Sequence, residues 1–456
     1  MPTFMKRSRI PASSAATFAW HARPGAFERL APPWERIEIL EQTGGIQNGG
    51  RVVLRVGTPP LAVRWVAEHR DYIEGRQFRD VQTAGPFARW EHTHTFEPDG
   101  PDACWLTDAI DYALPGGSFG QAVGGGHVQS KLDRTFAYRH RITAADLASH
   151  QRYADRPRLR VVVSGATGLV GSALTAFLST GGHTVLRLTR RPQRPSDIGW
   201  NPATNSLNPA DLEGCDAIVH LAGESIAAGR WTPERKQRIL DSRVEGTRLL
   251  AETIGRLAQP PRVFIAASAI GFYGDRGDET LDERSASGSN FLADVCRQWE
   301  AAAEPARQVS NLRLALLRFG VVLSPAGGAL RQMLLPFKLG AGGVVGSGQQ
   351  WMSWIAIDDV LETIHAILMR PEFAGTFNAV APEPITNAKF TRALGRTLHR
   401  PTILPMPAPA ARLAFGQMAD ELLLASTRVL PRQLSASGFA WRWPELGPAL
   451  DHLLGG

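Results

Sequence analysis

One segment in the middle of the chain constrains the fold more than any other, because a buried-strand pattern there runs directly into spaced glycines. The apolar run 159–163 leads to Gly165, Gly168 and Gly171, and a helix-like stretch follows at 172–179. Gly165 permits a tight turn, Gly168 lets the backbone approach a pyrophosphate, and Gly171 lets the helix pack on the strand. This order predicts a dinucleotide-binding loop, with an ordinary glycine-rich turn as the alternative. The predicted cofactor-binding residues here are Gly165, Ala166, Thr167, Gly168, Leu169, Val170 and Gly171.

The next strand candidate, 183–191, indicates which dinucleotide is bound. In such folds this strand normally ends in an acid that binds the ribose hydroxyls of NAD. Here it ends in Arg190 and Arg191. Guanidinium groups match a 2′-phosphate, which an acid would repel, so the pair favours NADP over NAD. Two solvated arginines at a strand end are the alternative.

Two further buried strands, 216–223 and 262–268, continue the alternation of strands with helical stretches. This alternation predicts an α/β fold with a doubly wound, parallel sheet of the Rossmann type. The first strand ends in Leu221, Ala222 and Gly223, which let a cofactor lie against the backbone. The second ends at Ser268, which we also expect beside the cofactor.

The composition is that of an ordinary globular protein, and 456 residues suffice for two to three domains. Three widely spaced cysteines disfavour a disulfide framework and favour a reducing compartment, so we expect a cytoplasmic protein. We expect neither a signal peptide nor a membrane span, since no uncharged apolar stretch approaches the roughly 20 residues required. The net charge of +7 is spread over both halves, which disfavours nucleic-acid binding.

The hydrophobic period changes near residue 157, which predicts domains over 1–157, 158–370 and 371–456. Upstream, Ser13 is expected to cap a short helix, and a flexible glycine loop at 124–127 to precede a closing helix from about 128 to 140. His92 and His94 share one face of a strand and could ligate a metal, but no third ligand is evident nearby, so we predict no metal site. Strands are predicted near 4–10, 35–41, 51–57, 62–70, 77–83, 87–96 and 103–112.

This upstream layout resembles the START-like or polyketide-cyclase-like helix-grip fold, an α+β domain whose sheet curves around a helix. The segment 26–34 is similar to that family's stretch after the first helix. The resemblance implies an apolar cavity that could hold a lipid or aromatic ligand, and a filled core is the alternative.

Several downstream motifs carry a family resemblance. They are the glycine fingerprint, His220-Leu221-Ala222-Gly223, Ser242-Arg243 with Gly246-Thr247, Phe272-Tyr273-Gly274, Trp299-Glu300, Gly346 to Gln349 and Ser353-Trp354-Ile355. Together they resemble the extended short-chain dehydrogenase/reductase superfamily, and more closely its atypical epimerase-like subfamily once labelled as cell-division inhibitors. The resemblance covers about 158–456 and implies an NADP-binding, epimerase-like oxidoreductase acting on a small molecule. The run 421–454 resembles the small domain that ends those proteins.

The chain departs from the superfamily in its proton-transfer residues. The parent enzymes use Tyr and Lys four residues apart on a helix, and none of the five tyrosines here has Lys four residues later. Phe291 and Val295 occupy the two places, Arg243 stands where an Asn is expected, and Ala269 replaces a Ser or Thr. The catalytic candidates that remain near the crevice are Tyr273, Ser268, Glu224 and Arg243, with packing the alternative role for Tyr273.

Seven glycines between 327 and 348 indicate a mobile or closely approached loop, which makes a substrate lid plausible. Asp358 is expected to cap a helix over 359–369. Two functions follow from the sequence: an NADP-dependent oxidoreductase or epimerase with a non-standard acid/base, or a catalytically inactive NADP-responsive ligand-binding or regulatory protein. The retained crevice favours the first, and the missing Tyr-Lys pair favours the second.

Overall fold

The computed structural model describes residues 2–456 and divides into two compact units. The first runs to Pro157 and also includes the short segments Ala176–Gly182 and Gly455–Gly456. The second contains Arg158–Thr175 and His183–Leu454. Residues 371–454 therefore lie in the same compact unit as the strands that follow residue 158.

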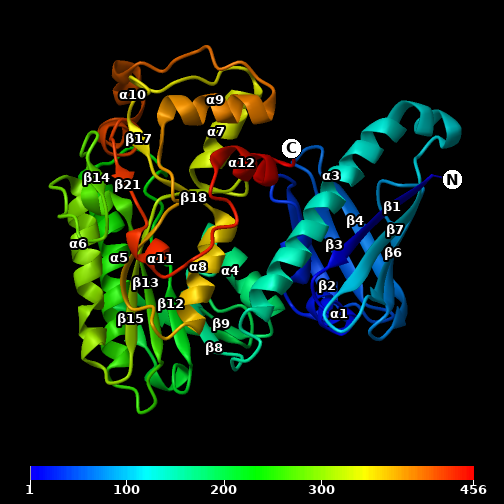
Figure 1. The fold of residues 1–456 in the computed structure, drawn as a ribbon, viewed down its shortest axis with the longest axis horizontal. Coiled ribbons are helices and arrows are strands. Elements are labelled where there is room, and N and C mark those ends of the chain that lie inside the picture. Colours follow the sequence, from blue (N-terminus) through cyan, green and yellow to red (C-terminus); the bar gives the residue numbers. More distant parts are fainter. Residues whose placement is uncertain (1) are drawn as a thin grey trace. The chain divides into compact units, whose positions relative to one another are not determined.

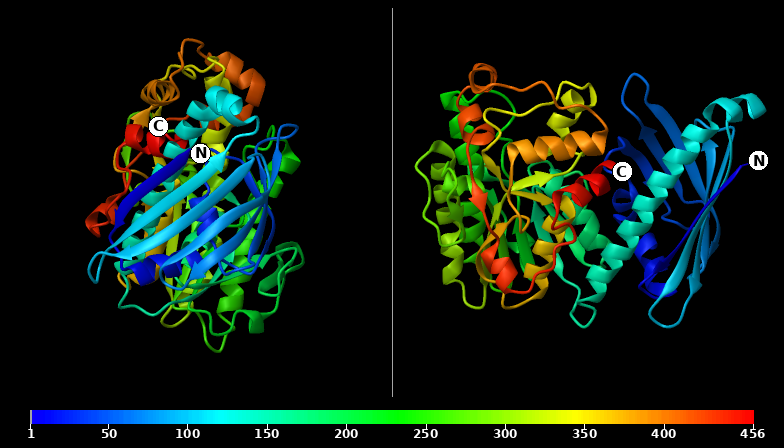
Figure 2. Two further views of the ribbon diagram at one scale, coloured as in Figure 1. Left: turned by 90° about the vertical axis from the view of Figure 1, so that its right-hand side faces the viewer. Right: turned by 45° about the horizontal axis from the view of Figure 1, so that its top comes forward.

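The first unit is an antiparallel sheet with helices on one face (Figure 1, Figure 2). Its strand order is β1-β7-β6-β5-β4-β3-β2, so the first strand returns to pair with the last. Ser13 caps α1 through its hydroxyl, which accepts a 3.2 Å hydrogen bond from the Ala16 amide, as predicted. The elements are β1 Thr3–Ile10, α1 Ser14–Ala22, α2 Ala26–Leu30, β2 Ile37–Thr43, β3 Arg51–Val56, β4 Val63–Ile73, β5 Gln77–Ala84, β6 Arg89–Pro98, β7 Cys104–Ala113 and α3 Gly117–Gln151.

The closing helix α3 is longer than the sequence predicted, and this corrects two expectations. It begins at Gly117 rather than near 128, and the glycines at 124–126 lie inside it instead of forming a flexible loop. Glycine lowers helix propensity by only about 1 kcal/mol per residue. Packing of α3 along β1 and β7 supplies tertiary contacts that outweigh this cost.

The second unit holds an eight-stranded sheet of order β11-β10-β9-β8-β12-β13-β15-β19 (Figure 1). All neighbours are parallel except the terminal pair β10 and β11, which confirms the predicted doubly wound Rossmann sheet. Helices α5 and α6 lie on one side of this sheet, and α4 and α8 on the other. Val161, Val162 and Val163 are all fully buried, since both faces of the sheet are covered.

The elements of this sheet and its helices are β8 Arg160–Ser164, α4 Leu169–Thr180, β9 Thr184–Thr189, β10 Asp197–Asn201, β11 Ser206–Leu207, β12 Ala217–His220, α5 Pro233–Ile254, β13 Val263–Ala269, α6 Phe291–Ala303, β15 Arg313–Phe319, α8 Ile357–Met369 and β19 Gly375–Ala379. The remaining elements of this unit are β14 Thr280–Leu281, β16 Val321–Leu323, α7 Gly328–Lys338, β17 Trp351–Met352, β18 Trp354–Ala356, β20 Ile385–Thr386, α9 Asn387–Leu398, α10 Ala408–Phe415, β21 Arg428–Val429, α11 Arg432–Ala436 and α12 Leu446–Leu454. None of the helices within residues 2–456 combines the length and apolar character that crossing a membrane requires.

The start of α8 differs from the prediction that Asp358 caps it. The helix begins at Ile357, and its cap position is Ala356, which offers no side-chain hydrogen bond. Asp358 lies in the first turn and pairs instead with His452 of α12, whose Nε2 is 3.0 Å from the carboxylate. Because this partner lies 94 residues away, local sequence could not reveal it.

Candidate functional site

The glycine loop between β8 and α4 has the compact backbone that a phosphate-binding loop needs. Gly165 has a φ of +68°, and a Cβ there would lie 2.8 Å from the Leu221 carbonyl carbon. A Cβ on Gly171 would lie 2.2 Å from the Gly165 oxygen. Side chains are therefore excluded at both positions, which leaves main-chain amides at the beginning of α4.

The loop is anchored to the neighbouring strand β12 through Ser164. The Ser164 hydroxyl oxygen accepts hydrogen bonds from the amides of Leu221 and Ala222, at 3.1 and 3.3 Å. Its hydrogen is then free to be donated to His220 Nδ1, 2.6 Å away. Burial lowers the pKa of His220 to about 3, so this imidazole is neutral. The residues that carry the cofactor prediction on β8 and β12 thus form one hydrogen-bonded unit.

Arg190 and Arg191 directly follow β9, which ends at Thr189, and both side chains are exposed. The acid nearest in sequence, Asp197, binds a different arginine: its carboxylate accepts bidentate hydrogen bonds from Arg187 at 2.8 and 2.7 Å. Asp197 also accepts the amides of Gln193 and Arg194, at 2.9 and 3.0 Å. These contacts of Asp197 hold the loop in place. Within the described chain, no carboxylate forms an ion pair with Arg190 or Arg191.

Arg243 on α5 lies beside the backbone at the end of β12. A Cβ on Gly223 would be 3.4 Å from the Arg243 guanidinium carbon. Arg243 donates one 2.9 Å hydrogen bond, to the Ile239 carbonyl, and lies 5.1 Å from the centre of the Trp299 ring. Burial lowers its pKa, and within residues 2–456 no carboxylate forms an ion pair with it. The guanidinium thus retains donors for an anion.

Glu224 lies at the same edge, and its carboxylate is already paired with an arginine. Its carboxylate binds Arg235, and its amide donates a 3.1 Å hydrogen bond to the Ser242 hydroxyl. The side chain of Glu224 is 35% exposed, so solvent can still reach it.

Tyr273 and Ser268 belong to a chain of buried polar contacts. The Tyr273 hydroxyl accepts a 2.9 Å hydrogen bond from Arg318 and donates a 2.8 Å bond to Asn378. Arg318 forms a bidentate pair with Glu300, to which Ser268 donates at 2.6 Å. Tyr273 is fully buried, and burial raises its pKa, an effect that Arg318 offsets only in part. Its catalytic role stays a prediction, and these contacts are those of a structural group.

The two positions that replace the Tyr-Lys pair lie at the start of α6. Phe291 packs against Trp231, with ring centres 5.2 Å apart, and Lys236 lies 5.0 Å from its ring centre. Val295 is buried. Beside them, burial raises the pKa of the Cys296 thiol to about 12, so this thiol supplies neither a negative charge nor a nucleophile at neutral pH.

The glycine-rich segment 327–348 is closely approached by other parts of the chain. A Cβ on Gly343 would lie 1.9 Å from the Leu404 carbonyl oxygen, and one on Gly346 would lie 2.7 Å from Leu424. The Gly346 amide donates to the Met406 carbonyl at 2.9 Å. Of the two predicted readings of this segment, these contacts favour close approach, and a lid role stays a prediction.

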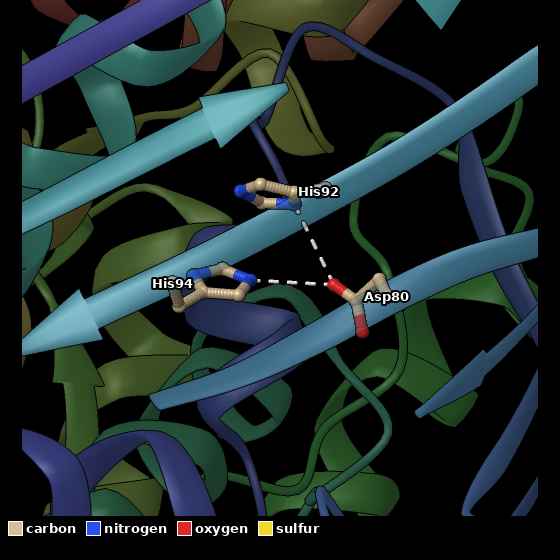
Figure 3. A group of neighbouring side chains, drawn as sticks. All are labelled: Asp80, His92 and His94. Atoms are coloured by element: carbon tan, nitrogen blue, oxygen red, sulfur yellow. Dashed lines mark hydrogen bonds and ion pairs between the residues drawn. The ribbon is translucent and has the colours of Figure 1, made fainter. Parts of the chain in front are cut away.

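In the first unit, the structure supplies a neighbour that the sequence did not reveal for His92 and His94. Asp80 of β5 reaches both imidazoles (Figure 3). Asp80 lies directly opposite His92 in the β5–β6 register. Period-two alternation placed His92 and His94 on one face of a strand, but only the strand pairing brings Asp80 to them.

Three family models match the chain. The NAD dependent epimerase/dehydratase family matches residues 161–380, and polyketide cyclase / dehydrase and lipid transport matches residues 10–141. A domain of unknown function, DUF1731, matches residues 406–453. These matches confirm both family resemblances that the sequence motifs indicated.

Individual proteins of known sequence or structure are also similar to this chain. Epimerase family protein Mb2239 of Mycobacterium bovis is 43% identical over 293 residues, 64% of this chain and 96% of that protein. The crystal structure of the nucleoside-diphosphate sugar epimerase from Corynebacterium glutamicum is 35% identical, covers 99% of this chain and 90% of its own, and has a TM-score of 0.82. The human epimerase family protein SDR39U1, solved with NADPH, is 36% identical, covers 65% of this chain and 99% of its own, and has a TM-score of 0.61.

Proposed function

The chain belongs to the NAD dependent epimerase/dehydratase family, and from this premise we propose that it binds NADP(H) and acts as an oxidoreductase or epimerase on a small molecule. One observation carries the cofactor choice: Arg190 and Arg191 follow β9 with unpaired guanidinium groups, while Asp197 binds Arg187. The loop Gly165–Gly171 holds the pyrophosphate in this proposal, and Leu221 to Gly223 and Ser268 border the cofactor.

The preference for NADP over NAD has an electrostatic basis. A 2′-phosphate brings about two negative charges to the end of β9, where two arginines can form charge-assisted hydrogen bonds. NAD brings only hydroxyls, and no acid of the described loop is free to accept them. The human relative solved with NADPH supports the same assignment.

The group that stabilises developing charge in this proposal is Arg243 rather than a tyrosine. Its guanidinium retains unused donors, is partly buried, and borders the Gly223 backbone along which the cofactor would lie. Such a cation stabilises negative charge on a substrate oxygen as hydride leaves or arrives at the neighbouring carbon. It also suits an anionic substrate, and the Corynebacterium relative is named for nucleoside-diphosphate sugars. Glu224, which pairs with Arg235 but is still 35% exposed, is the candidate for proton transfer in this arrangement.

Fluorescence titration tests the cofactor assignment. NADPH emission is expected to rise on binding, with at least a tenfold preference for NADPH over NADH, since two charge-assisted hydrogen bonds contribute about 1.5–3 kcal/mol each. Arg190→Ala with Arg191→Ala is expected to remove the preference while keeping NADH affinity. Arg248→Ala, an exposed arginine of α5, is the control and leaves both affinities unchanged. Equal affinities in the unmodified protein would reject the assignment.

A second function has its own support, because the Tyr273 hydroxyl is buried and fully paired. In that alternative the chain is an NADP-responsive binding protein without turnover. Incubation with NADPH carrying deuterium at C4 and with a small-molecule extract separates the two functions. Label that enters a metabolite, and that Gly168→Trp abolishes, supports the enzyme. Absence of transfer together with tight NADPH binding supports the binding protein.

A further inference from the structure

The interior of the first unit contains a layer of charged and imidazole groups between two apolar clusters. Along β6, buried Trp90 belongs to one cluster and buried Phe96 to the other. His92 and His94 lie between them and are only 2% and 5% exposed. The same order recurs on β7, where Asp108 separates Leu106 from Ile110. A layer of this kind is costly in a core unless the charges are paired.

Three of these side chains converge on one point (Figure 3). The Asp80 carboxylate oxygen Oδ2 lies 3.5 Å from His92 Nδ1 and 3.3 Å from His94 Nε2. The ligand atoms of the three residues all lie within 4.8 Å of one another. Two ligands at 2.0–2.2 Å from a tetrahedral metal are separated by about 3.3–3.6 Å. The spacing therefore suits a shared cation.

The opposite nitrogens of both imidazoles face a second carboxylate. His92 Nε2 donates to Asp108 at 2.7 Å, and His94 Nδ1 lies 2.7 Å from the same oxygen. The other Asp108 oxygen is 2.5 Å from His140 of α3. Metal-binding histidines almost always have such an outer partner, which fixes the ring and raises the basicity of the ligating nitrogen.

Asp80 also has an outer partner and a path to solvent. Its second oxygen lies 2.8 Å from His69 Nε2, on β4. The Asp80 side chain is 23% exposed, whereas Asp108 is buried. Three buried atoms of the layer, Asp80 Oδ1, His94 Nδ1 and His140 Nδ1, lack a well-aligned hydrogen bond. The side chains of the layer therefore do not satisfy all of one another's hydrogen-bonding groups.

We propose that Asp80, His92 and His94 bind a divalent transition-metal cation of the zinc type, with Asp108 positioning the two imidazoles. Two imidazoles and one carboxylate are a ligand set that zinc and ferrous iron accept, and three protein ligands leave a coordination position open for water or a ligand. The site is independent of the NADP(H) site proposed above. It also gives the interior of this unit a polar anchoring point, in place of the purely apolar cavity that the family resemblance implied.

Metal titration of the full-length protein is the direct test. The protein is stripped with a chelator, titrated with ZnCl₂ by calorimetry, and analysed for bound metal after dialysis. One zinc ion per chain is expected. The combined change Asp80→Asn, His92→Gln and His94→Gln is expected to abolish this binding, and Asp108→Asn to weaken it about tenfold. His127→Gln, an exposed histidine of α3, is the control and keeps full binding.

X-ray absorption of the unmodified zinc-bound protein keeps the test decisive if the buried variants fail to fold. The proposal expects nitrogen or oxygen neighbours at about 2.0–2.1 Å, scattering from two imidazole rings, and no sulfur. It is overturned if no saturable zinc binds, if the triple variant folds and binds equally well, or if the spectrum lacks imidazole scattering.

Discussion

Arg318 and Tyr273 meet in the interior of the Rossmann unit, where the guanidinium donates a 2.9 Å hydrogen bond to the tyrosine hydroxyl. The same guanidinium carbon lies 3.5 Å from the centre of the Phe272 ring. Arg318 thereby ties the segment after β13 to Glu300 of α6. The only tyrosine of this unit is thus held as part of the scaffold.

Tyr273→Phe is therefore expected to affect stability more than activity. The change removes two hydrogen bonds and leaves buried Asn378 and Arg318 groups short of a partner, at a cost of about 1–3 kcal/mol. Chemical denaturation measures this loss, while NADPH affinity stays within about twofold. If the variant keeps its stability and loses more than about a hundredfold in turnover, Tyr273 transfers a proton after all.

Asp197→Asn is expected to loosen the loop that carries the arginine pair. The pKa of Asp197 is lowered to about 2, first by its hydrogen bonds with Arg187, so the carboxylate is fully ionised at neutral pH. An amide cannot accept all four donors, and about 2 kcal/mol of stability is lost. The affinity of this variant for NADPH should fall severalfold, and its selectivity for NADPH over NADH should remain. The double arginine variant, in contrast, should lose this selectivity. Unchanged NADPH affinity would show that the loop needs no such support.

Gly171→Ala tests the close approach within the phosphate loop. Its Cβ would lie 2.2 Å from the Gly165 oxygen, and backbone atoms cannot move aside cheaply. Overpacking of this kind costs about 1–3 kcal/mol or more, and NADPH binding is expected to be lost. Gly447→Ala in α12, where nothing lies within 4 Å, is the matched control and should be neutral or slightly stabilising. Full NADPH binding by Gly171→Ala would contradict the loop assignment.

The acid sensitivity of the Rossmann unit should depend on His220. Its folded pKa of about 3 lies below the unfolded value near 6.5, so the unfolded chain takes up the proton first as pH falls. Stability present above pH 6.5 is then lost at about 1.4 kcal/mol per pH unit down to the folded pKa. Burial raises the pKa of Asp359 to about 7, which has the opposite effect on stability between pH 4 and 7.

The difference between unmodified protein and His220→Gln isolates this contribution, because Asp359 acts equally in both. Thermal unfolding is measured between pH 6.5 and 4.5. Over this range the stability of the unmodified protein is expected to fall more steeply with decreasing pH than that of the variant. Parallel curves would show that the imidazole gains no proton on unfolding.

Local features of the sequence predicted the Rossmann sheet and the tight glycine turn between β8 and α4. Glycine is required at 171 because Gly165 and Ala166, only a few residues away, approach it, whereas Gly165 is required by its own positive φ and by the approach of distant Leu221 and Ala222. The arginine pair after β9 is likewise a local signal. Strand periodicity gave every strand of the first unit to within a few residues.

Other features depend on contacts between distant residues and could not be predicted. The partners of Tyr273 lie 45 and 105 residues further along the chain. Asp80 meets His92 only through the register of β5 and β6, which no local pattern specifies. The extent of α3 depends on tertiary packing that overrides its glycines.

Calorimetric titration of the full-length protein with NADPH and with NADH tests the central claim most directly. The account predicts one NADPH bound per chain, at least tenfold tighter than NADH, because Arg190 and Arg191 bind the 2′-phosphate. A protein that binds neither coenzyme, or both with equal affinity, would contradict it.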